Sequence, residues 1–239
     1  STNVIISTKR IMVTIAPEHT MSTHQTHPTP PSGLPQVLHA DEWLIVFRKP
    51  VPMLSVPGIG PEKADCLVSR AAAVYSGARI VHRLDRDTSG VIVLARDAAT
   101  HRALSIQFQD RLVTKHYEAI VAGQPIDDEG LIDAAIRKDL ENKPRQCVDP
   151  VEGKPSQTAW RVLERLGDRT RLELRPRTGR SHQLRLHLKH MGHPILGDDL
   201  YAPPEAIAMA TRLCLHATLL TFTHPATNES MTVTDPAPF

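Results

Sequence analysis

Residues 82–90 restrict the folds open to this 239-residue chain more than any other stretch. Their sequence, His-Arg-Leu-Asp-Arg-Asp-Thr-Ser-Gly, is polar, and the five residues 91–95, Val-Ile-Val-Leu-Ala, follow it without a polar side chain. An apolar run of this length next to a glycine predicts a strand buried on both faces. The polar segment is then a loop at the end of a central strand, and loops held on a rigid frame often carry binding and catalytic groups.

Asp85 is the candidate reactive group of this loop. Arg83 and Arg86 flank it in the sequence, and cations close to a carboxyl group favour its ionised form. An ionised carboxylate suits a nucleophile or a base, and it does not suit a general acid. The same residues also fit a turn in which Asp, Thr and Ser side chains hydrogen-bond the backbone. The residues alone leave both interpretations open.

The charge of the chain is concentrated in one region. The formal net charge of +2 is too small to indicate a nucleic-acid partner. Between residues 169 and 189, however, Glu173 is the one acidic residue among these cations: Arg169, Arg171, Arg175, Arg177, Arg180, Arg185 and Lys189. Such a cluster is an electrostatic footprint for phosphate, although a solvated surface gives the same pattern.

Cysteine usage and hydropathy favour a cytoplasmic protein. Cys66, Cys147 and Cys214 lie far apart and lack Cys-x-x-Cys spacing, so neither a disulfide framework nor a zinc site is expected. No apolar run approaches the roughly 18 residues of a membrane span. We expect a monomer that makes no use of a membrane.

Residues 1–35 differ in composition from the rest of the chain. Pro, Thr, His and Ser dominate residues 17–35, and such a segment cannot bury enough apolar surface to hold one conformation. We expect residues 1–35 to be a disordered or variable tail. With 41% hydrophobic and 23% charged residues overall, the remaining residues 36–239 are expected to form one globular domain.

Hydrophobic periodicity and turn residues predict where the strands and helices of this domain lie. The expected strands are residues 36–38, 43–47, 91–95, 114–123, 131–137, 157–166 and 170–174. The expected helices are residues 61–75, 98–109 and 181–191. This pattern favours the α+β class, with a mixed, largely antiparallel sheet, flanking helices and two halves on either side of a central basic cleft.

The helix expected at 181–191 has two different faces. Four side chains follow the spacing i, i+3, i+4, i+7 and should face the core: Leu184, His187, Leu188 and Met191. His182, Arg185 and Lys189 should then lie on the opposite, basic face.

Three different motifs occur in order along the chain. The first is the polar loop 82–90 with its apolar strand, and the second is Lys115-x-Tyr117 on the strand expected at 114–123. The third, at residues 178–187, is Thr-Gly-Arg-Ser-His-Gln-Leu-Arg-Leu-His. Together they resemble the RluA family of RNA pseudouridine synthases, and the resemblance covers about residues 36–239.

The resemblance implies a fold, a reaction and three catalytic residues. The fold is that of the pseudouridine synthases, and the reaction converts uridine to pseudouridine in structured RNA. Asp85 corresponds to the catalytic aspartate of the family. Tyr117 corresponds to the tyrosine that stacks on the target uracil and serves as acid or base, and Arg180 to the arginine that forms a salt bridge with the aspartate. No cofactor is implied, because the isomerisation is redox-neutral.

The resemblance also implies contacts with RNA. Arg83 corresponds to the arginine that fills the gap left by the flipped base. The other expected RNA-binding residues are Arg86, Arg177, His182 and Arg185, which would hold backbone phosphates. Segments near the end of the chain, at residues 201–206, 212–217 and 222–225, resemble one branch of the family, and this resemblance implies substrates in a tRNA anticodon stem-loop and in 23S rRNA.

Two other classes of function fit parts of the sequence. A non-catalytic RNA-binding module would use the same basic cleft. A metal-dependent RNA hydrolase would need a ligand cluster, but His182, His187 and His190 fall on different faces of one helix and His-Glu-x-x-His does not occur. Ser89 lacks the Gly-x-Ser-x-Gly setting of a serine hydrolase.

Overall fold

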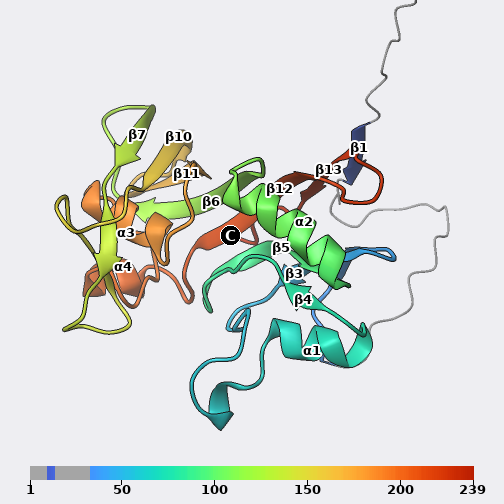
Figure 1. Ribbon diagram of the computed structural model, residues 1–239. Helices are drawn as coiled ribbons and strands as arrows, with labels where there is room; N and C mark the ends of the chain where they lie inside the picture. Colours follow the sequence, from blue (N-terminus) through green and yellow to red (C-terminus); the bar gives the residue numbers. More distant parts are fainter. Residues whose placement is uncertain (1–9, 14–32) are drawn as a thin grey trace, which may run out of the picture.

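The computed structural model describes residues 10–13 and 33–239, and one large sheet runs through it (Figure 1). The strands of this sheet are β1 (Arg10–Val13), β2 (Val37–Ala40), β3 (Leu44–Lys49), β4 (Arg79–Ile80), β5 (Ser89–Ala95), β6 (Thr114–Ala122), β7 (Glu129–Asp133), β10 (Gln157–Arg165), β11 (Arg169–Pro176), β12 (Leu215–Thr223) and β13 (Ser230–Thr234). A separate hairpin consists of β8 (Ile136–Lys138) and β9 (Gln146–Val148). The helices are α1 (Leu67–Val74), α2 (Ala98–Gln109), α3 (Gln183–His190) and α4 (Pro204–Ala208), with a 3-10 turn at Pro61–Lys63.

The sheet is mixed and mostly antiparallel, as predicted. Its main path is β2-β3-β5-β12-β6-β11-β10-β7. Within the described residues the parallel pairs are β5 with β12 and β1 with β13. All seven residues of β5 are buried, which confirms the central strand expected from the apolar run.

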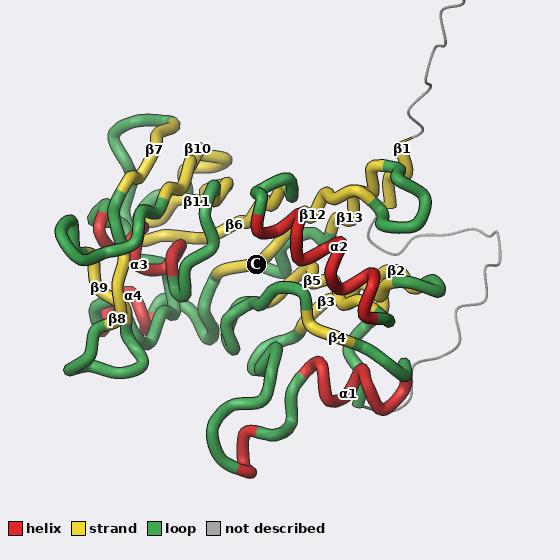
Figure 2. The backbone as a smooth tube through the Cα atoms, viewed as in Figure 1, coloured by secondary structure: helices red, strands yellow, loops and turns green. Residues whose placement is uncertain are grey.

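Two groups of helices cover the two ends of this sheet. Figure 1 shows α1 and α2 beside β3, β4 and β5, and α3 and α4 beside β7, β10 and β11. The hydrophobic core is divided in the same way, with separate clusters around β5 and around β6, β11 and α3. Figure 2 shows β8 and β9 beside α3 and α4, at the edge of this second half.

Strand β12 joins the two halves. Its residue Ala217 is the register partner of Gly90 in β5 and also of Tyr117 in β6. Gly90 has φ +115°, and a Cβ atom there would lie 2.3 Å from the carbonyl oxygen of Ala217. Only glycine permits this close approach between the strands. The loop of Asp85 and the strand of Tyr117 are therefore fixed to the same point of one strand.

Side chains explain two local boundaries. The Asp41 carboxylate accepts hydrogen bonds from the backbone N–H groups of Trp43 and Leu44, both 2.8 Å long, and closes the turn between β2 and β3. Asp97 accepts from the backbone N–H of Thr100 at 2.8 Å and caps α2. The strands predicted at residues 36–38 and 43–47 are present as β2 and β3, which pair as an antiparallel hairpin, and the predicted helix 98–109 is confirmed.

Two predicted boundaries were wrong. The helix expected at 61–75 begins only at Leu67, because residues 61–63 form a separate 3-10 turn and Cys66 is extended. The strand expected at 131–137 is divided between β7 and β8, because the first part bonds to β10 and the second to β9.

The tail expected at residues 1–35 falls mostly outside the described residues. Of that stretch, residues 10–13 form β1 and pair in parallel with β13, a strand that the composition did not predict.

Candidate active site

A cleft of about 1650 Å³ lies between the two halves of the sheet. Small-molecule sites have volumes of roughly 300–1,000 Å³, so this cleft is large enough for a segment of a macromolecule. Three aspartates line it: Asp85, Asp87 and Asp199. The lysines and arginines that line it are Arg83, Arg86, Arg111, Lys115, Arg175, Arg177, Arg180 and Arg185. The excess of cations suits a polyanion such as RNA.

A buried lysine supports the loop that carries Asp85. Lys49, at the end of β3, is fully buried, and its Nζ donates to the carbonyl oxygens of Pro50 at 3.1 Å, Met53 at 2.7 Å and Arg86 at 3.0 Å. Burial lowers the pKa of Lys49 to about 7. The side chain thus connects the loop after β3 to the loop of Asp85.

Two further contacts hold the same loop. The buried Ser55 hydroxyl donates to the carbonyl of Leu84 at 2.7 Å and accepts from its N–H at 3.1 Å. The backbone N–H of Thr88 donates to the carbonyl oxygen of Asp85 at 3.1 Å and closes the turn. The backbone beside Asp85 is therefore fixed.

The Asp85 carboxylate is half-buried in the cleft and is without a hydrogen-bond or ion-pair partner among the described residues. Its negative charge affects the pKa of tyrosines on both sides of the cleft. It adds to burial in raising the pKa of Tyr117, and it also helps to raise the pKa of Tyr201. An unpaired carboxylate in a basic cleft is available to react with a bound molecule.

Tyr117 lies on β6 beside the loop of Asp85. Its half-buried ring packs against the hydrophobic clusters of both halves and lines the cleft. Burial raises the pKa of its phenol, so the group keeps its proton at neutral pH. A neutral aromatic ring at this place can stack on a base and can give or take a proton.

Arg180 lies in the same cleft, but the predicted salt bridge with Asp85 is wrong for this structure. The ion pairs within 4.0 Å between described residues do not include this pair. The Arg180 side chain is exposed, and its backbone N–H donates to the Gln183 side chain at 3.0 Å. An exposed guanidinium gains little from an ion pair in water, so the contact is not favoured on energetic grounds.

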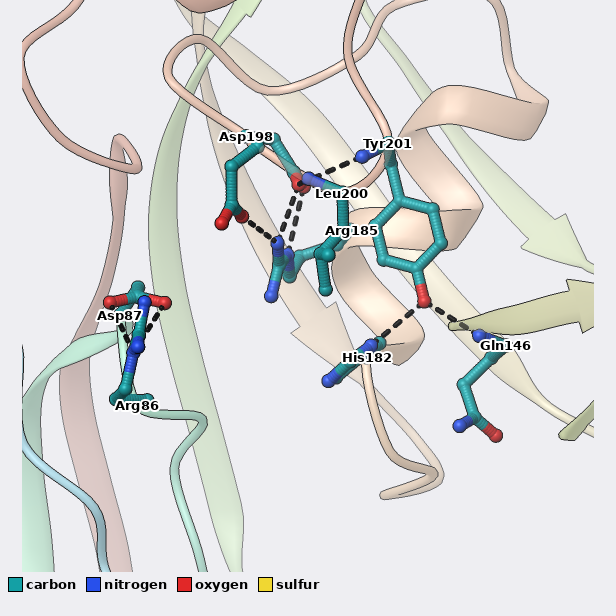
Figure 3. A network of polar contacts seen from close by, with 9 residues as sticks. Arg86, Asp87, Gln146, His182, Arg185, Asp198, Leu200 and Tyr201 are labelled. Atoms are coloured by element: carbon teal, nitrogen blue, oxygen red, sulfur yellow. Dashed lines mark hydrogen bonds and ion pairs between the residues drawn. The ribbon is translucent and has the colours of Figure 1, made fainter. Parts of the chain in front are cut away.

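The prediction that Arg185 lies on an exposed basic face was also wrong. The side chain is 2% exposed, and its Nε donates to Asp198 Oδ2 at 2.8 Å (Figure 3). Its Nη2 contacts Asp198 Oδ1 at 2.5 Å and Asp199 Oδ1 at 3.1 Å. A buried cation needs such partners, and these two carboxylates occupy its Nε and Nη2 donors.

The remaining predicted RNA-binding residues line the cleft. Arg83 and Arg177 are exposed. Arg86 is exposed too, but its Nε lies 3.1 Å from Asp87 Oδ1, which neutralises part of its charge. His182 is half-buried, with Nδ1 at 2.8 Å from the Tyr201 hydroxyl.

Three residues of the site had no predicted role. Lys49 ends β3, two residues after its apolar run at 44–47, and a cation at the end of a buried strand is a signal of a buried polar contact. The signal for Asp198 was Arg185 itself, because a cation that stands between apolar residues of a buried helix needs an acidic partner. For Tyr201 the periodicity gave no signal, since its contacts come from segments distant in sequence.

Ser89 belongs to a second buried network. Its Oγ lies 2.7 Å from His216 Nδ1, and His216 Nε2 lies 3.1 Å from Asp235 Oδ2. Arg212 donates to the same Ser89 oxygen at 2.7 Å, and Arg48 Nε donates to Asp235 at 2.7 Å. Because Ser89, His216 and Asp235 are buried within the sheet, this triad is closed to a substrate.

The described residues contain neither a metal-ligand cluster nor a membrane-spanning helix. Within residues 10–13 and 33–239, no three His, Cys, Asp or Glu side chains are grouped as ligands for a metal ion. Among the described helices, none has the length and apolar character that crossing a membrane requires.

Comparison with known proteins identifies the family. A family model described as RNA pseudouridylate synthase matches residues 43–190. The chain belongs to this family. The dual-specificity RNA pseudouridine synthase RluA of Escherichia coli (strain K12) is 50% identical over 204 residues, which cover 85% of this chain and 93% of that protein. The protein of the same name from Pasteurella multocida is 44% identical over 213 residues, or 88% and 97% of the two chains.

Solved structures of the pseudouridine synthase family have the same fold. The structure of human RNA pseudouridylate synthase domain containing 1 matches with a TM-score of 0.72 at 29% identity, covering 90% of this chain and 87% of that one. Human RNA pseudouridylate synthase domain containing 4 matches with a TM-score of 0.67 at 26% identity, over 84% and 88%. The predicted family, the α+β fold and the isomerase class are confirmed.

Proposed function

We propose that the basic cleft binds structured RNA with one uridine turned out of its helix, and that Asp85 is the carboxylate that acts on this nucleotide. The observation that carries the proposal is the unpaired, half-buried Asp85 carboxylate in a cleft lined by cations and by the Tyr117 ring. Breaking the N1–C1′ bond, turning the base and forming the C5–C1′ bond requires access to base and ribose. The nucleotide must leave its stack, at a cost of roughly a few kcal/mol.

The residues divide the reaction between them. Asp85 attacks or assists at the uridine while the base detaches, and Tyr117 stacks on the base during its rotation. When C5 has bonded to C1′, its proton leaves and N1 gains one, and the phenol of Tyr117 takes part in this transfer. One proton is lost from C5 and one is gained at N1, so the composition of the nucleoside is unchanged, no electron is gained or lost, and the reaction requires no external oxidant or reductant.

The exposed cations of the cleft would hold the RNA. Arg177 and Arg180 are free to contact backbone phosphates, and Arg83 lies in the loop beside Asp85, where it can occupy the space left by the flipped base. Phosphate contacts of this kind make affinity fall steeply with salt.

The substrates are proposed from the relatives. Several relatives are named dual-specificity RNA pseudouridine synthases. We infer that this chain acts on a uridine in a tRNA anticodon stem-loop and on one in 23S rRNA, as a monomer in the cytoplasm. Mapping pseudouridines in total RNA with and without the protein tests the choice of substrates.

Tritium release from RNA that carries 5-³H-uridine tests the reaction. The wild type should release tritium, and Asp85→Asn should release none while binding the same RNA within a few-fold. Asp199→Asn is the matched control, because it removes an exposed carboxylate of the same cleft; it should retain most of the activity. A wild type that binds RNA without releasing tritium would support a non-catalytic module, and substantial release by Asp85→Asn would exclude Asp85 from the mechanism.

A further inference from the structure

A buried polar network ends at one imidazole on the wall of the cleft (Figure 3). It starts at Asp198, which is fully buried and whose Oδ1 accepts hydrogen bonds from the backbone N–H groups of Leu200 at 3.0 Å and Tyr201 at 3.1 Å. The same carboxylate holds the Arg185 guanidinium. Asp198 therefore fixes the turn that places Tyr201.

The Tyr201 ring is held on several sides. It is 4% exposed, and the Arg185 guanidinium and the Lys189 ammonium lie 5.3 and 5.9 Å from its centroid. Its hydroxyl oxygen accepts a hydrogen bond from the backbone N–H of Gln146 at 2.8 Å and lies 2.8 Å from His182 Nδ1. Of the two partners of this hydroxyl among the described residues, Gln146 contributes a donor, and His182 Nδ1 is the partner that can accept the hydroxyl proton.

This arrangement selects one tautomer of His182. If Nδ1 accepts the phenolic proton, a neutral imidazole carries its own proton on Nε2. Figure 3 shows this second nitrogen on the side of the ring away from Tyr201, toward Arg86 and Asp87. Burial lowers the pKa of His182, against the opposing charge of Asp85, and so favours the uncharged ring.

The backbone of His182 is strained in a way that supports a specific role. Its φ is +55°, in the left-handed region that non-glycine residues rarely adopt. Such strain persists only where surrounding contacts impose it, and it is concentrated at functional sites. Here the strained residue immediately precedes α3 and directs its ring into the cleft.

We propose that Tyr201 is a positioning residue that holds His182 as the neutral Nε2–H tautomer, and that His182 presents this N–H as an uncharged hydrogen-bond donor to an oxygen of the RNA in the cleft. The inference rests on the proposed function, because it needs RNA in the cleft. An uncharged, directed donor orients the nucleotide, whereas the arginines of the cleft attract phosphate from any direction. His182 therefore differs from the phosphate-binding cation that the sequence suggested.

Nuclear magnetic resonance tests the tautomer without any turnover. In a long-range ¹H–¹⁵N correlation spectrum of the 239-residue chain at pH 7, His182 is assigned as the signal set lost in His182→Gln. The wild type should show an unprotonated Nδ1 and a protonated Nε2. Tyr201→Phe keeps the ring but removes the hydroxyl, and it should show a mixture of tautomers. A wild-type Nδ1–H tautomer, an imidazolium, or an unchanged pattern in Tyr201→Phe would overturn the proposal.

Two substitutions of His182 test the donor. Glutamine can place an amide N–H near the position of Nε2, whereas asparagine reaches only the position of Nδ1. His182→Gln should keep kcat/KM within a few-fold of the wild type, and His182→Asn should lose about tenfold, as expected for one lost hydrogen bond. Thermal unfolding at the wild-type temperature is the control for both variants. If both pass it, equal losses of kcat/KM would overturn the role of the Nε2–H donor. If either does not fold, the tautomer spectrum of the wild type and Tyr201→Phe decides whether the proposal stands.

The failures of the two proposals are distinguishable. If the wild type releases no tritium from RNA, the proposed function fails, and the spectrum still reports whether Tyr201 sets the tautomer. If the wild type is active and the tautomer is wrong, only the inference on Tyr201 and His182 fails.

Discussion

Replacing Lys49 by methionine removes the buried amine beneath the loop of Asp85 and keeps an unbranched side chain of similar length. In the wild type, Nζ reaches the carbonyl oxygens of Pro50, Met53 and Arg86. A neutral amine donates two hydrogen bonds, each worth about 1 kcal/mol net. At pH 9 the wild type should therefore be more stable than Lys49→Met by about 2 kcal/mol.

This difference in stability should shrink as the pH falls. Burial lowers the pKa of Lys49 from its ordinary 10.5 to about 7. Between these two values the unfolded chain binds more protons at this site than the folded chain, so wild-type stability rises with pH through the window. With about 1.4 kcal/mol per pK unit and half-protonation near pH 7, the wild type should gain about 2 kcal/mol between pH 7 and pH 9. The variant lacks this contribution.

Urea denaturation followed by circular dichroism at pH 7, 8 and 9 measures the effect. Lys63→Met is the matched control, because Lys63 is exposed and its ammonium comes no closer than 4.0 Å to Glu62; its difference from the wild type should be small and independent of pH. A difference between the wild type and Lys49→Met that stays constant over the three pH values would refute the reasoning. It would mean that the buried amine is as protonated in the folded chain as in the unfolded one.

Three further substitutions test the site. Asp198→Ala removes the buried carboxylate of Arg185 and leaves it only the exposed Asp199 among its carboxylate partners, so it should lower the free energy of unfolding by about 3–5 kcal/mol. Asp199→Ala, at an exposed carboxylate, should change it by less than about 1 kcal/mol in the same urea titration. Arg177→Gln should weaken RNA binding and reduce the slope of log K against log salt by about 1; an unchanged slope in filter-binding titrations would exclude a phosphate contact. Tyr117→Phe should bind RNA normally and lose turnover, and normal tritium release would remove its phenol from the proton transfer.

The local parts of the structure were predictable from the sequence. The apolar run 91–95 gave the central strand, and the capped pattern of residues 98–109 gave α2 with its observed bounds, because periodicity and caps act over a few residues. The resemblance carried by the three motifs also predicted that Asp85, Tyr117 and Arg180 share one site, and all three line the same cleft.

Long-range contacts account for what was missed. The helical period predicted that Arg185 faces solvent. The residue is buried instead, because Asp198, thirteen residues later, supplies a buried carboxylate that pairs with it. The pairing of Arg180 with Asp85 depends on two loops from opposite halves, whose separation no periodicity encodes. The role of Tyr201 depends on Gln146 and His182, which come from two other segments.

The shared register of Gly90, Ala217 and Tyr117 has a consequence for how the chain tolerates insertions and deletions. One strand separates the loop of the aspartate from the strand of the tyrosine, so their spacing is set by two interstrand distances of about 4.8 Å each. Extra residues in the turn between β6 and β7, or in the connection from β9 to β10, leave that spacing unchanged. Deleting a single residue within β12 would turn the side chains beyond the deletion to the opposite face of the sheet. It would also shift β12 against β5 and β6, and so misalign the loop of Asp85 with the strand of Tyr117. The enzyme can therefore be lengthened at its periphery, while its central strand keeps a fixed length.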